Sequence, residues 1–157
     1  MVKVLFVCMG NICRSPMAEA IFQDKVNKAG LSSEIQVDSA GTSRYEVGKP
    51  AHPGTLAVLS KQNIPYNGRA RQVQYNDLND YDYVLAMDRD NLAFLLRYAS
   101  GTRADIRLFL SYAQQAGMVD VNEVPDPYYD DNFEGAYRLI ERGCQAFLDY
   151  LRETESV

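Results

Sequence analysis

Short runs of apolar residues alternate along this chain with longer segments in which apolar residues recur at helical spacing. A short run rich in β-branched residues favours a buried strand, and a 3.6-residue spacing favours a helix. The four runs that predict strands are Val2–Val7, Ile35–Val37, Tyr83–Ala86 and Ile106–Leu110. The segments that predict helices are Ser15 up to Gly30, Pro53–Gln62, Asp88 to Leu96 and Phe133–Leu151.

Strands that alternate with helices are typical of βαβ units, so we expect an α/β fold with a parallel sheet and helices on both faces. No linker, repeat or low-complexity tract interrupts the pattern, and residues 1–157 are expected to form one domain. Two boundaries are predicted in detail. Ser15 is expected to cap the first helix, with Pro16 at its first position, and Asp38 is expected to end the second strand.

Composition narrows the class of protein. The 157 residues are 46% hydrophobic and 24% charged, with a net charge of −5 and no run of five or more basic residues. These values favour a globular domain and argue against a nucleic-acid or anionic-membrane surface. No apolar stretch approaches the ~20 residues of a membrane span, and the N-terminal run lacks a small-residue cleavage site, which favours a strand over a signal peptide.

Cysteine and histidine usage indicates a reducing compartment. Three cysteines without a secretion signal fit the cytoplasm better than an oxidising compartment. Because these cysteines and the single histidine, His52, show no paired ligand spacing, no metal site is expected.

The segment Cys8–Ser15 joins the first predicted strand to the first helix, at the edge where ligands bind in parallel α/β folds. Gly10 and Asn11 tolerate left-handed backbone angles, so the loop can turn successive N–H groups inward around an anion. The helix N-terminus adds a partial positive charge, and Arg14 can donate two hydrogen bonds to one phosphate. The residues expected to bind phosphate are Met9, Gly10, Asn11, Ile12, Cys13, Arg14 and Ser15.

The same environment favours the thiolate form of Cys8, with Ser15 as a hydrogen-bond donor to it. A nucleophile prepared in this way needs no histidine base, so a Cys-His protease built on His52 has little support. The alternative for Cys8 is a core residue, since free cysteines are commonly buried. A nucleotide-binding P-loop is excluded because no Gly-Lys-Ser/Thr follows the loop.

The sequence resembles the low-molecular-weight protein tyrosine phosphatases from its first predicted strand to its last helix. The segments that carry the resemblance are Val7–Pro16, Asp38–Ala40, Ala70–Gln72, Met87–Asp88 and Asp126–Tyr129. The resemblance implies a four-stranded parallel sheet flanked by helices. It also implies that the substrates are phosphotyrosine-containing proteins, that no metal or cofactor takes part, and that the reaction passes through a phosphocysteine intermediate. We also expect the protein to be a monomer.

Asp126 is the expected general acid. A phenolate leaving group, with a pKa of about 10, leaves poorly unless it is protonated. Pro125 and Pro127 give Asp126 a non-helical setting from which its carboxyl can reach the loop. The resemblance implies this role, and then the role of base for the water that hydrolyses the phosphocysteine. Without the resemblance, an Asp-Pro pair is most simply a turn former.

The resemblance also implies supporting residues around the loop. Asn11 would shape the loop, and Ser39 would hydrogen-bond with it. Asp88 would accept from Arg14 or from loop amides, or would only cap the next helix. One departure concerns Gly68, because some family members carry a loop-supporting histidine in this segment; the local hydrogen-bond network is therefore expected to differ.

Three tyrosines and Cys13 complete the predicted site, whereas Cys144 is expected outside it. Tyr45, Tyr128 and Tyr129 would be aromatic walls for a phenyl ring, or otherwise ordinary surface residues. The resemblance implies that Cys13 forms a reversible disulfide with Cys8, which would protect the nucleophile from over-oxidation; a buried spectator is the alternative. Cys144 lies on the apolar stripe of the last helix and is most simply a core residue.

Two rival functions use the same loop. Arsenate reduction needs further cysteines to resolve its intermediate, and no cysteine lies between Met87 and Phe109, so an external thiol would have to substitute. A non-catalytic phospholigand-binding module would keep the loop without turnover. The presence of Cys8, Arg14 and Asp126 together argues against it.

Overall fold

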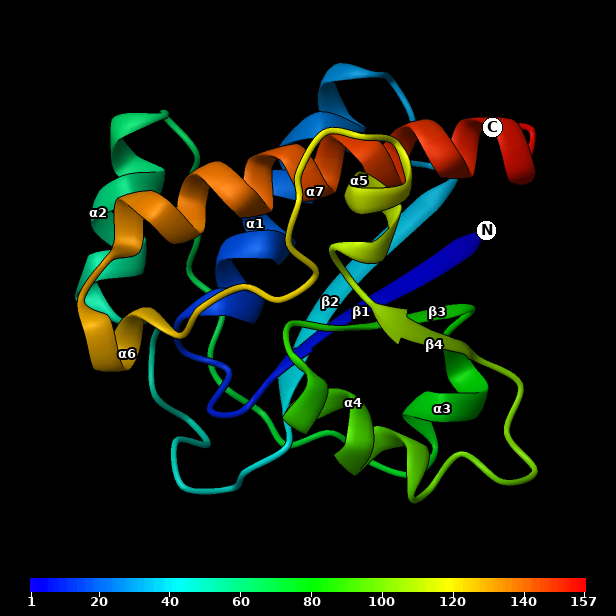
Figure 1. The fold of residues 1–157 in the computed structure, drawn as a ribbon, viewed down its shortest axis with the longest axis horizontal. Helices are drawn as coiled ribbons and strands as arrows, with labels where there is room; N and C mark the ends of the chain where they lie inside the picture. Colours follow the sequence, from blue (N-terminus) through cyan, green and yellow to red (C-terminus); the bar gives the residue numbers. More distant parts are fainter.

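Four parallel strands form the centre of the molecule, which a computed structural model describes for residues 1–157. The strands are β1 (Val2–Cys8), β2 (Ile35–Gly41), β3 (Tyr83–Ala86) and β4 (Asp105–Leu108), in the spatial order β2-β1-β3-β4 (Figure 1). Cys8 pairs with Gly41 and Val7 pairs with Ala86. The carboxyl ends of β1, β2 and β3 therefore meet at one edge of the sheet, where the polar loops gather.

Helices cover both faces of this sheet (Figure 1). One face packs against α1 (Arg14–Lys28), α2 (Pro53–Lys61), α5 (Ser111–Gln115) and α7 (Phe133–Thr154), and the other against α3 (Asp77–Asp80) and α4 (Arg89–Leu96). The short helix α6 (Pro127–Asp130) precedes α7. The predicted α/β class, with a four-stranded parallel sheet and helices on both faces, is confirmed. None of the helices has the length and apolar character that a membrane crossing requires.

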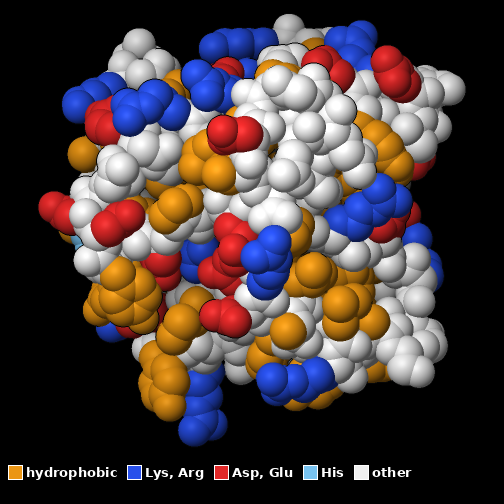
Figure 2. Space-filling view, viewed as in Figure 1, with side chains coloured by type: hydrophobic (Ala, Val, Ile, Leu, Met, Phe, Trp, Pro, Cys, Tyr) orange, Lys and Arg blue, Asp and Glu red, His pale blue; other side chains and the backbone are white.

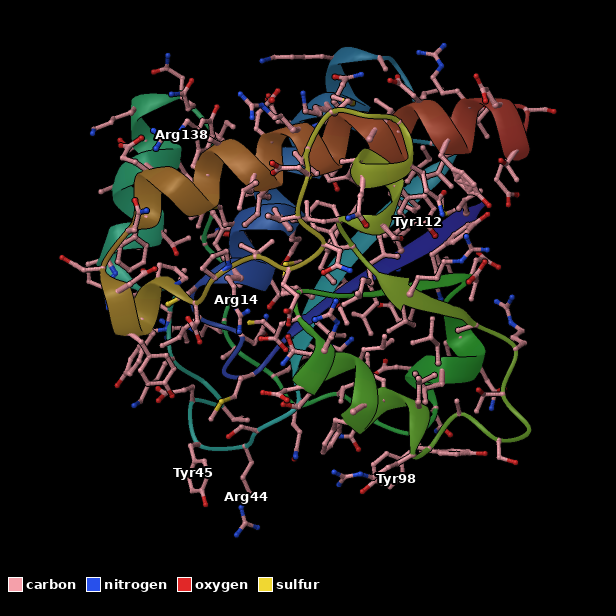
Figure 3. All side chains as sticks on the ribbon, viewed as in Figure 1. Arg14, Arg44, Tyr45, Tyr98, Tyr112 and Arg138 are labelled. Atoms are coloured by element: carbon pink, nitrogen blue, oxygen red, sulfur yellow. The ribbon has the colours of Figure 1, made fainter.

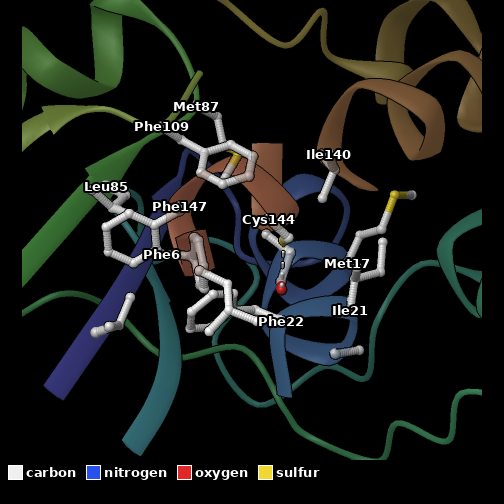
Figure 4. Packing of buried hydrophobic residues seen from close by; sticks show 14 of the residues in the cluster. Phe6, Met17, Ile21, Phe22, Leu85, Met87, Phe109, Ile140, Cys144 and Phe147 are labelled. Carbon is white, nitrogen blue, oxygen red and sulfur yellow. Dashed lines mark hydrogen bonds between the residues drawn. The ribbon is translucent and has the colours of Figure 1, made fainter. Parts of the chain in front are cut away.

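The side chains of β1 point alternately to the two faces of the sheet, and the hydrophobic core is accordingly divided into two clusters. Val4 and Phe6 point to the larger cluster, under α1 and α7, and Leu5 and Val7 point to the smaller one, under α3 and α4. In the larger cluster Phe6 meets Phe22 and Phe109 edge to face, with ring centroids 5.7 and 5.4 Å apart (Figure 4).

Cys144 also belongs to the larger cluster, as the sequence predicted. Its side chain is fully buried on α7 beside the Ala18 carbonyl, and burial raises the pKa of its thiol well above the usual value. Cys144 is therefore an unreactive core residue at neutral pH.

Three local predictions were wrong at their boundaries. Strand β2 does not end at Asp38 but continues to Gly41, because each residue of this stretch pairs with β1. Helix α1 begins at Arg14, and Ser15 does not cap it because its hydroxyl contacts Cys8 instead. Pro16 is accordingly the third helical residue. Strand β4 ends at Leu108, and α3, α5 and α6 have no counterpart in the sequence pattern.

Candidate active site

The loop between β1 and α1 wraps around the sulfur of Cys8. The backbone N–H of Asn11 donates to Cys8 Sγ at 3.3 Å, and the Ser15 hydroxyl lies 3.0 Å from the same atom. Asn11, and not Gly10, adopts the left-handed conformation, with φ 57°. An asparagine tolerates this conformation, which turns its N–H toward the sulfur. Cys8 is thus buried, and its sulfur is also the atom around which the loop is arranged.

Strand β2 and the segment after it support the loop from one side. Thr42 and Ser43 donate backbone N–H groups to the carbonyl oxygens of Cys8 and Met9, both at 2.9 Å. A Cβ atom at Gly41 would lie 2.7 Å from the Met9 carbonyl oxygen. Glycine is needed at the end of β2 because the loop approaches the strand this closely.

Arg14 lies buried behind the loop (Figure 3), and one of its terminal nitrogens is fully engaged. Its Nη1 donates to Asp88 Oδ2 at 2.7 Å and to the Val124 carbonyl oxygen at 2.8 Å. Its Nη2 makes a longer contact of 3.3 Å to Asp126 Oδ2, and its buried Nε has no protein partner. Burial alone would lower the pKa of Arg14, but Cys8 and the two carboxylates raise it, so the guanidinium stays charged.

Asp88 fulfils both of the roles left open by the sequence. While Oδ2 accepts from Arg14, Oδ1 accepts from the backbone N–H of Asn91 at 2.8 Å and caps helix α4. Asp88 therefore couples the position of the guanidinium to the start of a helix on the opposite face of the sheet.

Asp126 faces the same cleft as Cys8. Its Oδ1 accepts from the Tyr128 N–H at 3.1 Å and caps the short helix α6, in which Pro127 takes the first position. Asp126 itself is extended, as predicted from its two flanking prolines, although the residues that follow are helical. Its second oxygen, Oδ2, is the one that points to Arg14.

The cleft has a volume of about 260 Å³. Its lining consists of Cys8, Met9, Gly10, Ile12, Cys13, Ser43, Tyr45, Glu46, Asp126, Tyr128 and Tyr129. The three tyrosines that the sequence proposed as walls all line it, and Tyr128 and Tyr129 meet edge to face at 5.3 Å. Figure 3 shows Tyr45 projecting from the molecule next to Arg44, and Figure 2 shows hydrophobic side chains gathered in the same region.

The sequence did not predict Ser43 or Glu46 in this cleft. Glu46 forms an ion pair with Lys49 at 2.8 Å and approaches Gly10. No group of three or more His, Cys, Asp or Glu side chains has an arrangement that could hold a metal ion.

Asn11 connects the loop to β2 through its side-chain amide. Its Nδ2 donates to the hydroxyls of Ser15 at 2.8 Å and Ser39 at 2.9 Å, and its Oδ1 accepts from the Arg71 N–H at 3.0 Å. Ser39 in turn donates to Glu19 Oε1 at 2.6 Å, and so does the Tyr66 hydroxyl at 2.9 Å. The sequence predicted the Asn11–Ser39 contact but missed Glu19, Tyr66 and Arg71.

Tyr66 fills the space beside Gly68. A Cβ atom at Gly68 would lie 2.6 Å from Cζ of the Tyr66 ring. The expectation that the support of the loop differs in this segment stays a prediction.

Cys13 lines the cleft with Cys8, and both are free thiols. Burial, followed by the neighbouring Cys8, raises the pKa of Cys13 to about 12. Cys13 is therefore protonated at neutral pH and differs from Cys8 in having no hydroxyl or amide donor directed at its sulfur.

Comparison with known proteins identifies the family of this chain, and the match extends over almost its whole length. Residues 3–157 match the family described as low molecular weight phosphotyrosine protein phosphatase. The chain is 43% identical over 159 residues to the low molecular weight protein-tyrosine-phosphatase YfkJ of Bacillus subtilis, covering 100% of both proteins. It is 38% identical over 151 residues to the phosphatase PtpA of Staphylococcus epidermidis, covering 96% of this chain and 94% of that protein.

Solved structures agree with this result. The crystal structure of YfkJ from Bacillus subtilis aligns with a TM-score of 0.92 at 44% identity, covering 98% of this chain and 96% of that one. A Drosophila arginine phosphatase aligns with a TM-score of 0.90 at 34% identity, covering 96% and 98%. The loop that surrounds Cys8 and the four-stranded sheet beneath it are those of a phosphatase. The chain belongs to the low molecular weight phosphotyrosine protein phosphatase family.

Proposed function

We propose that this phosphatase removes phosphate from phosphotyrosine in proteins by a two-step reaction in which Cys8 is the nucleophile and Asp126 the general acid and base. The observation that carries the proposal is the pattern of free donors on Arg14. Its Nη1 is occupied by Asp88 and Val124, whereas Nε has no partner and Nη2 makes only one long contact. Nε and Nη2 form one edge of the guanidinium, which is suited to two oxygens of a phosphate.

In the first step the Cys8 thiolate attacks phosphorus. The S–P bond forms while the P–O bond to the phenol breaks, and Asp126 gives its proton to the departing phenolate oxygen. Loop N–H groups from Met9 to Ser15 and the start of α1 bind the phosphate oxygens, and Arg14 stabilises the charge that develops on them.

In the second step Asp126, now a carboxylate, takes a proton from a water molecule that attacks the phosphocysteine. The S–P bond breaks, inorganic phosphate is released, and Cys8 returns to its thiolate form. The Ser15 hydroxyl, 3.0 Å from the sulfur, supports the leaving thiolate as a hydrogen-bond donor.

The cleft walls favour an aromatic substrate. Tyr45, Tyr128 and Tyr129 line the cleft beside Cys8, and all three are exposed, so their aromatic rings are available to a phenyl ring. An open cleft of this kind suits a phosphotyrosine on an accessible protein segment. Arsenate reduction has less support, because Cys144 is buried in the core and leaves only Cys13 near the nucleophile.

The proposal is tested by measuring phosphate release from three peptides of one sequence that carry phosphotyrosine, phosphoserine or phosphoarginine. We expect turnover of phosphotyrosine, no turnover by the Cys8→Ser variant, and a phosphorylated Cys8 trapped by acid quenching of Asp126→Ala. Preference for phosphoarginine would overturn the substrate assignment, and activity of Cys8→Ser would overturn the nucleophile. Retention of bound phosphopeptide without any turnover would instead indicate a binding module.

A further inference from the structure

Glu19 is a partly buried carboxylate that the proposed reaction does not use. It lies on α1, one turn after Ser15, and its Oε1 accepts hydrogen bonds from both Ser39 and Tyr66. A hollow of about 130 Å³ between α1 and the Ile64–Tyr66 segment opens beside it. Glu19 is connected to Cys8 through three side chains, those of Ser39, Asn11 and Ser15.

A backbone donor at one end and a carboxylate at the other fix the direction of the hydrogen bonds that run from Arg71 through Asn11 and Ser39 to Glu19. The Arg71 backbone N–H can only donate, so the Asn11 atom that it contacts is the carbonyl oxygen and the NH₂ group must face the two serines. Each serine hydroxyl therefore accepts one hydrogen from Asn11 and has its own hydrogen left to donate. Ser39 donates to Glu19. The Ser15 hydrogen has two acceptors within reach, Cys8 Sγ at 3.0 Å and the Ala40 carbonyl oxygen at 3.5 Å, and a thiolate at the shorter distance is the stronger acceptor.

An ionised Glu19 also fixes the direction of the hydrogen bond at its own end of this chain of side chains. A carboxylate only accepts, so it holds the Ser39 hydrogen and prevents Ser39 from donating toward Asn11. A protonated Glu19 could instead donate to Ser39, which would compete with the Asn11 amide for the oxygen of Ser39. The orientation of the Ser15 hydrogen toward Cys8 is thus linked to the charge of Glu19.

We propose that Glu19 and Tyr66 are positioning residues, which keep the Asn11 amide and the Ser15 hydroxyl oriented so that Ser15 donates to Cys8 during the reaction. The proposal rests on the role of Cys8 as the nucleophile. Tyr66 acts through Glu19, since its hydroxyl donates to the same oxygen as Ser39. Gly68 acts through Tyr66, because any side chain at Gly68 would meet the Tyr66 ring.

The charges around Glu19 determine how the variants behave. Burial raises the pKa of Glu19, the hydrogen bonds from Ser39 and Tyr66 lower it, Asp38 raises it and Arg71 lowers it. Loss of the Tyr66 hydroxyl therefore moves the pKa of Glu19 further upward.

Two other groups in this region do not change the direction of that effect. Asp24 lines the hollow beside Glu19 but is paired with Lys28 at 2.9 Å. Burial and the charge of Glu19 raise the pKa of Tyr66, so its hydroxyl remains a donor at every pH at which the enzyme works.

The test compares Tyr66→Phe and Gly68→Ala with the wild type. The rate of Cys8 alkylation and the kcat for an aryl phosphate are measured against pH. Because Glu19 then protonates at a higher pH, we expect the acidic limb of both profiles to move upward. At a pH on that limb kcat should fall about three- to tenfold, the usual range for one hydrogen bond, with KM unchanged. The double variant should be no worse than either single variant, because both changes disrupt the same hydrogen bond from the Tyr66 hydroxyl to Glu19.

Two further variants separate positioning from a general loss of packing. Tyr137→Phe removes a hydroxyl from another partly buried tyrosine with no hydrogen-bond partner in the protein, and its profiles should match the wild type. In a Glu19→Gln background, which keeps an acceptor but cannot ionise, Tyr66→Phe should no longer move the limb. Unchanged profiles for Tyr66→Phe, or an equal shift for Tyr137→Phe, would overturn the inference.

The two readouts also separate this inference from the proposed function. Alkylation of Cys8 needs no substrate, so its pH profile tests the positioning role even if the wild type fails to hydrolyse phosphotyrosine. Failure of the wild type to turn over any phosphopeptide would defeat the proposed function alone.

Discussion

Asp88 holds Arg14 from the side opposite the cleft, with Oδ2 at 2.7 Å from Nη1. The pair is only partly exposed, and the guanidinium itself is almost completely buried. An ion pair in this position contributes mainly to orientation, because it occupies Nη1 and does not involve the Nε–Nη2 edge, to which the proposed function assigns the phosphate.

Replacing Asp88 with Asn should separate this role from helix capping. Asn caps helices as well as Asp does, so α4 should persist, but the anionic acceptor of Arg14 is lost. A charged hydrogen bond of this kind contributes about 1.5–3 kcal/mol, and we expect kcat/KM for an aryl phosphate to fall about 10- to 100-fold. Steady-state kinetics and the inhibition constant of inorganic phosphate measure the effect.

The matched control is Asp90→Asn, an exposed acidic residue in the first turn of the same helix. This variant should retain wild-type kinetics. If Asp88→Asn binds inorganic phosphate as tightly as the wild type and keeps its rate, then Asp88 serves only as a cap.

The role of Asp126 predicts a dependence on the leaving group. Asp126→Asn keeps an N-cap for α6 but cannot donate a proton, so hydrolysis of phosphotyrosine should slow by roughly 10²–10⁴-fold. The loss should be smaller for an aryl phosphate whose phenol is more acidic, because that phenolate leaves without protonation. A series of substituted phenyl phosphates measures this difference.

Asp131→Asn is the control for that series. Asp131 is exposed just after α6 and has φ 58°, a conformation that Asn tolerates well, so its kinetics should not change. A loss in Asp126→Asn that appears only in KM, and equally for every leaving group, would show that Asp126 binds substrate without transferring a proton.

The packing of α7 against the segment after β4 predicts a change in stability. A Cβ atom at Gly143 would lie 2.5 Å from Cζ of Phe109 and 2.9 Å from Cδ2 of Leu110. Gly143→Ala would gain about 1 kcal/mol in helix propensity, but overpacking of a core costs about 1–3 kcal/mol. We expect the free energy of unfolding in urea to fall by up to about 2 kcal/mol, whereas Arg142→Ala, at an exposed neighbouring position, should change it by less than about 0.5 kcal/mol.

Strands β1 and β3 and helix α7 could be predicted because their patterns are local. The apolar runs and the long stripe from Phe133 are visible without knowing what packs on them. The end of β2 is different. Asp38 and Ser39 are polar residues that normally favour a turn, and they remain in the strand because β1 pairs with them along its whole length. Tertiary pairing of this kind has no signal in the local sequence.

The same distinction applies to the site. Cys8 and Arg14 are only six residues apart, at the two ends of one loop, so their spacing alone suggested that they act together. Glu19 looked like an ordinary polar residue of a helix, although its position four residues after Ser15 places it on the same helical face. Tyr66 comes from a distant irregular segment, and only the fold brings its hydroxyl to Glu19.

The protonation of Cys13 predicts how the expected Cys8–Cys13 disulfide depends on pH. Cys13 must be a thiolate to attack an oxidised Cys8, and burial, the largest cause of its raised pKa, persists after Cys8 is oxidised. A thiol is almost entirely protonated at any pH well below its pKa. In that range its thiolate fraction grows about tenfold for each pH unit. After a pulse of peroxide, closure of the disulfide should therefore be slow at pH 6 and accelerate steadily toward pH 9.

Mass spectrometry of quenched samples follows this step, with oxidised Cys8 and the disulfide as separate species. Cys13→Ser should accumulate oxidised Cys8 without any disulfide, and Cys144→Ser should behave as the wild type because Cys144 lies in the core. A closure rate that does not vary with pH would mean that another base activates Cys13. A disulfide that never forms at any pH would leave Cys13 as a buried neighbour of the nucleophile with no redox role.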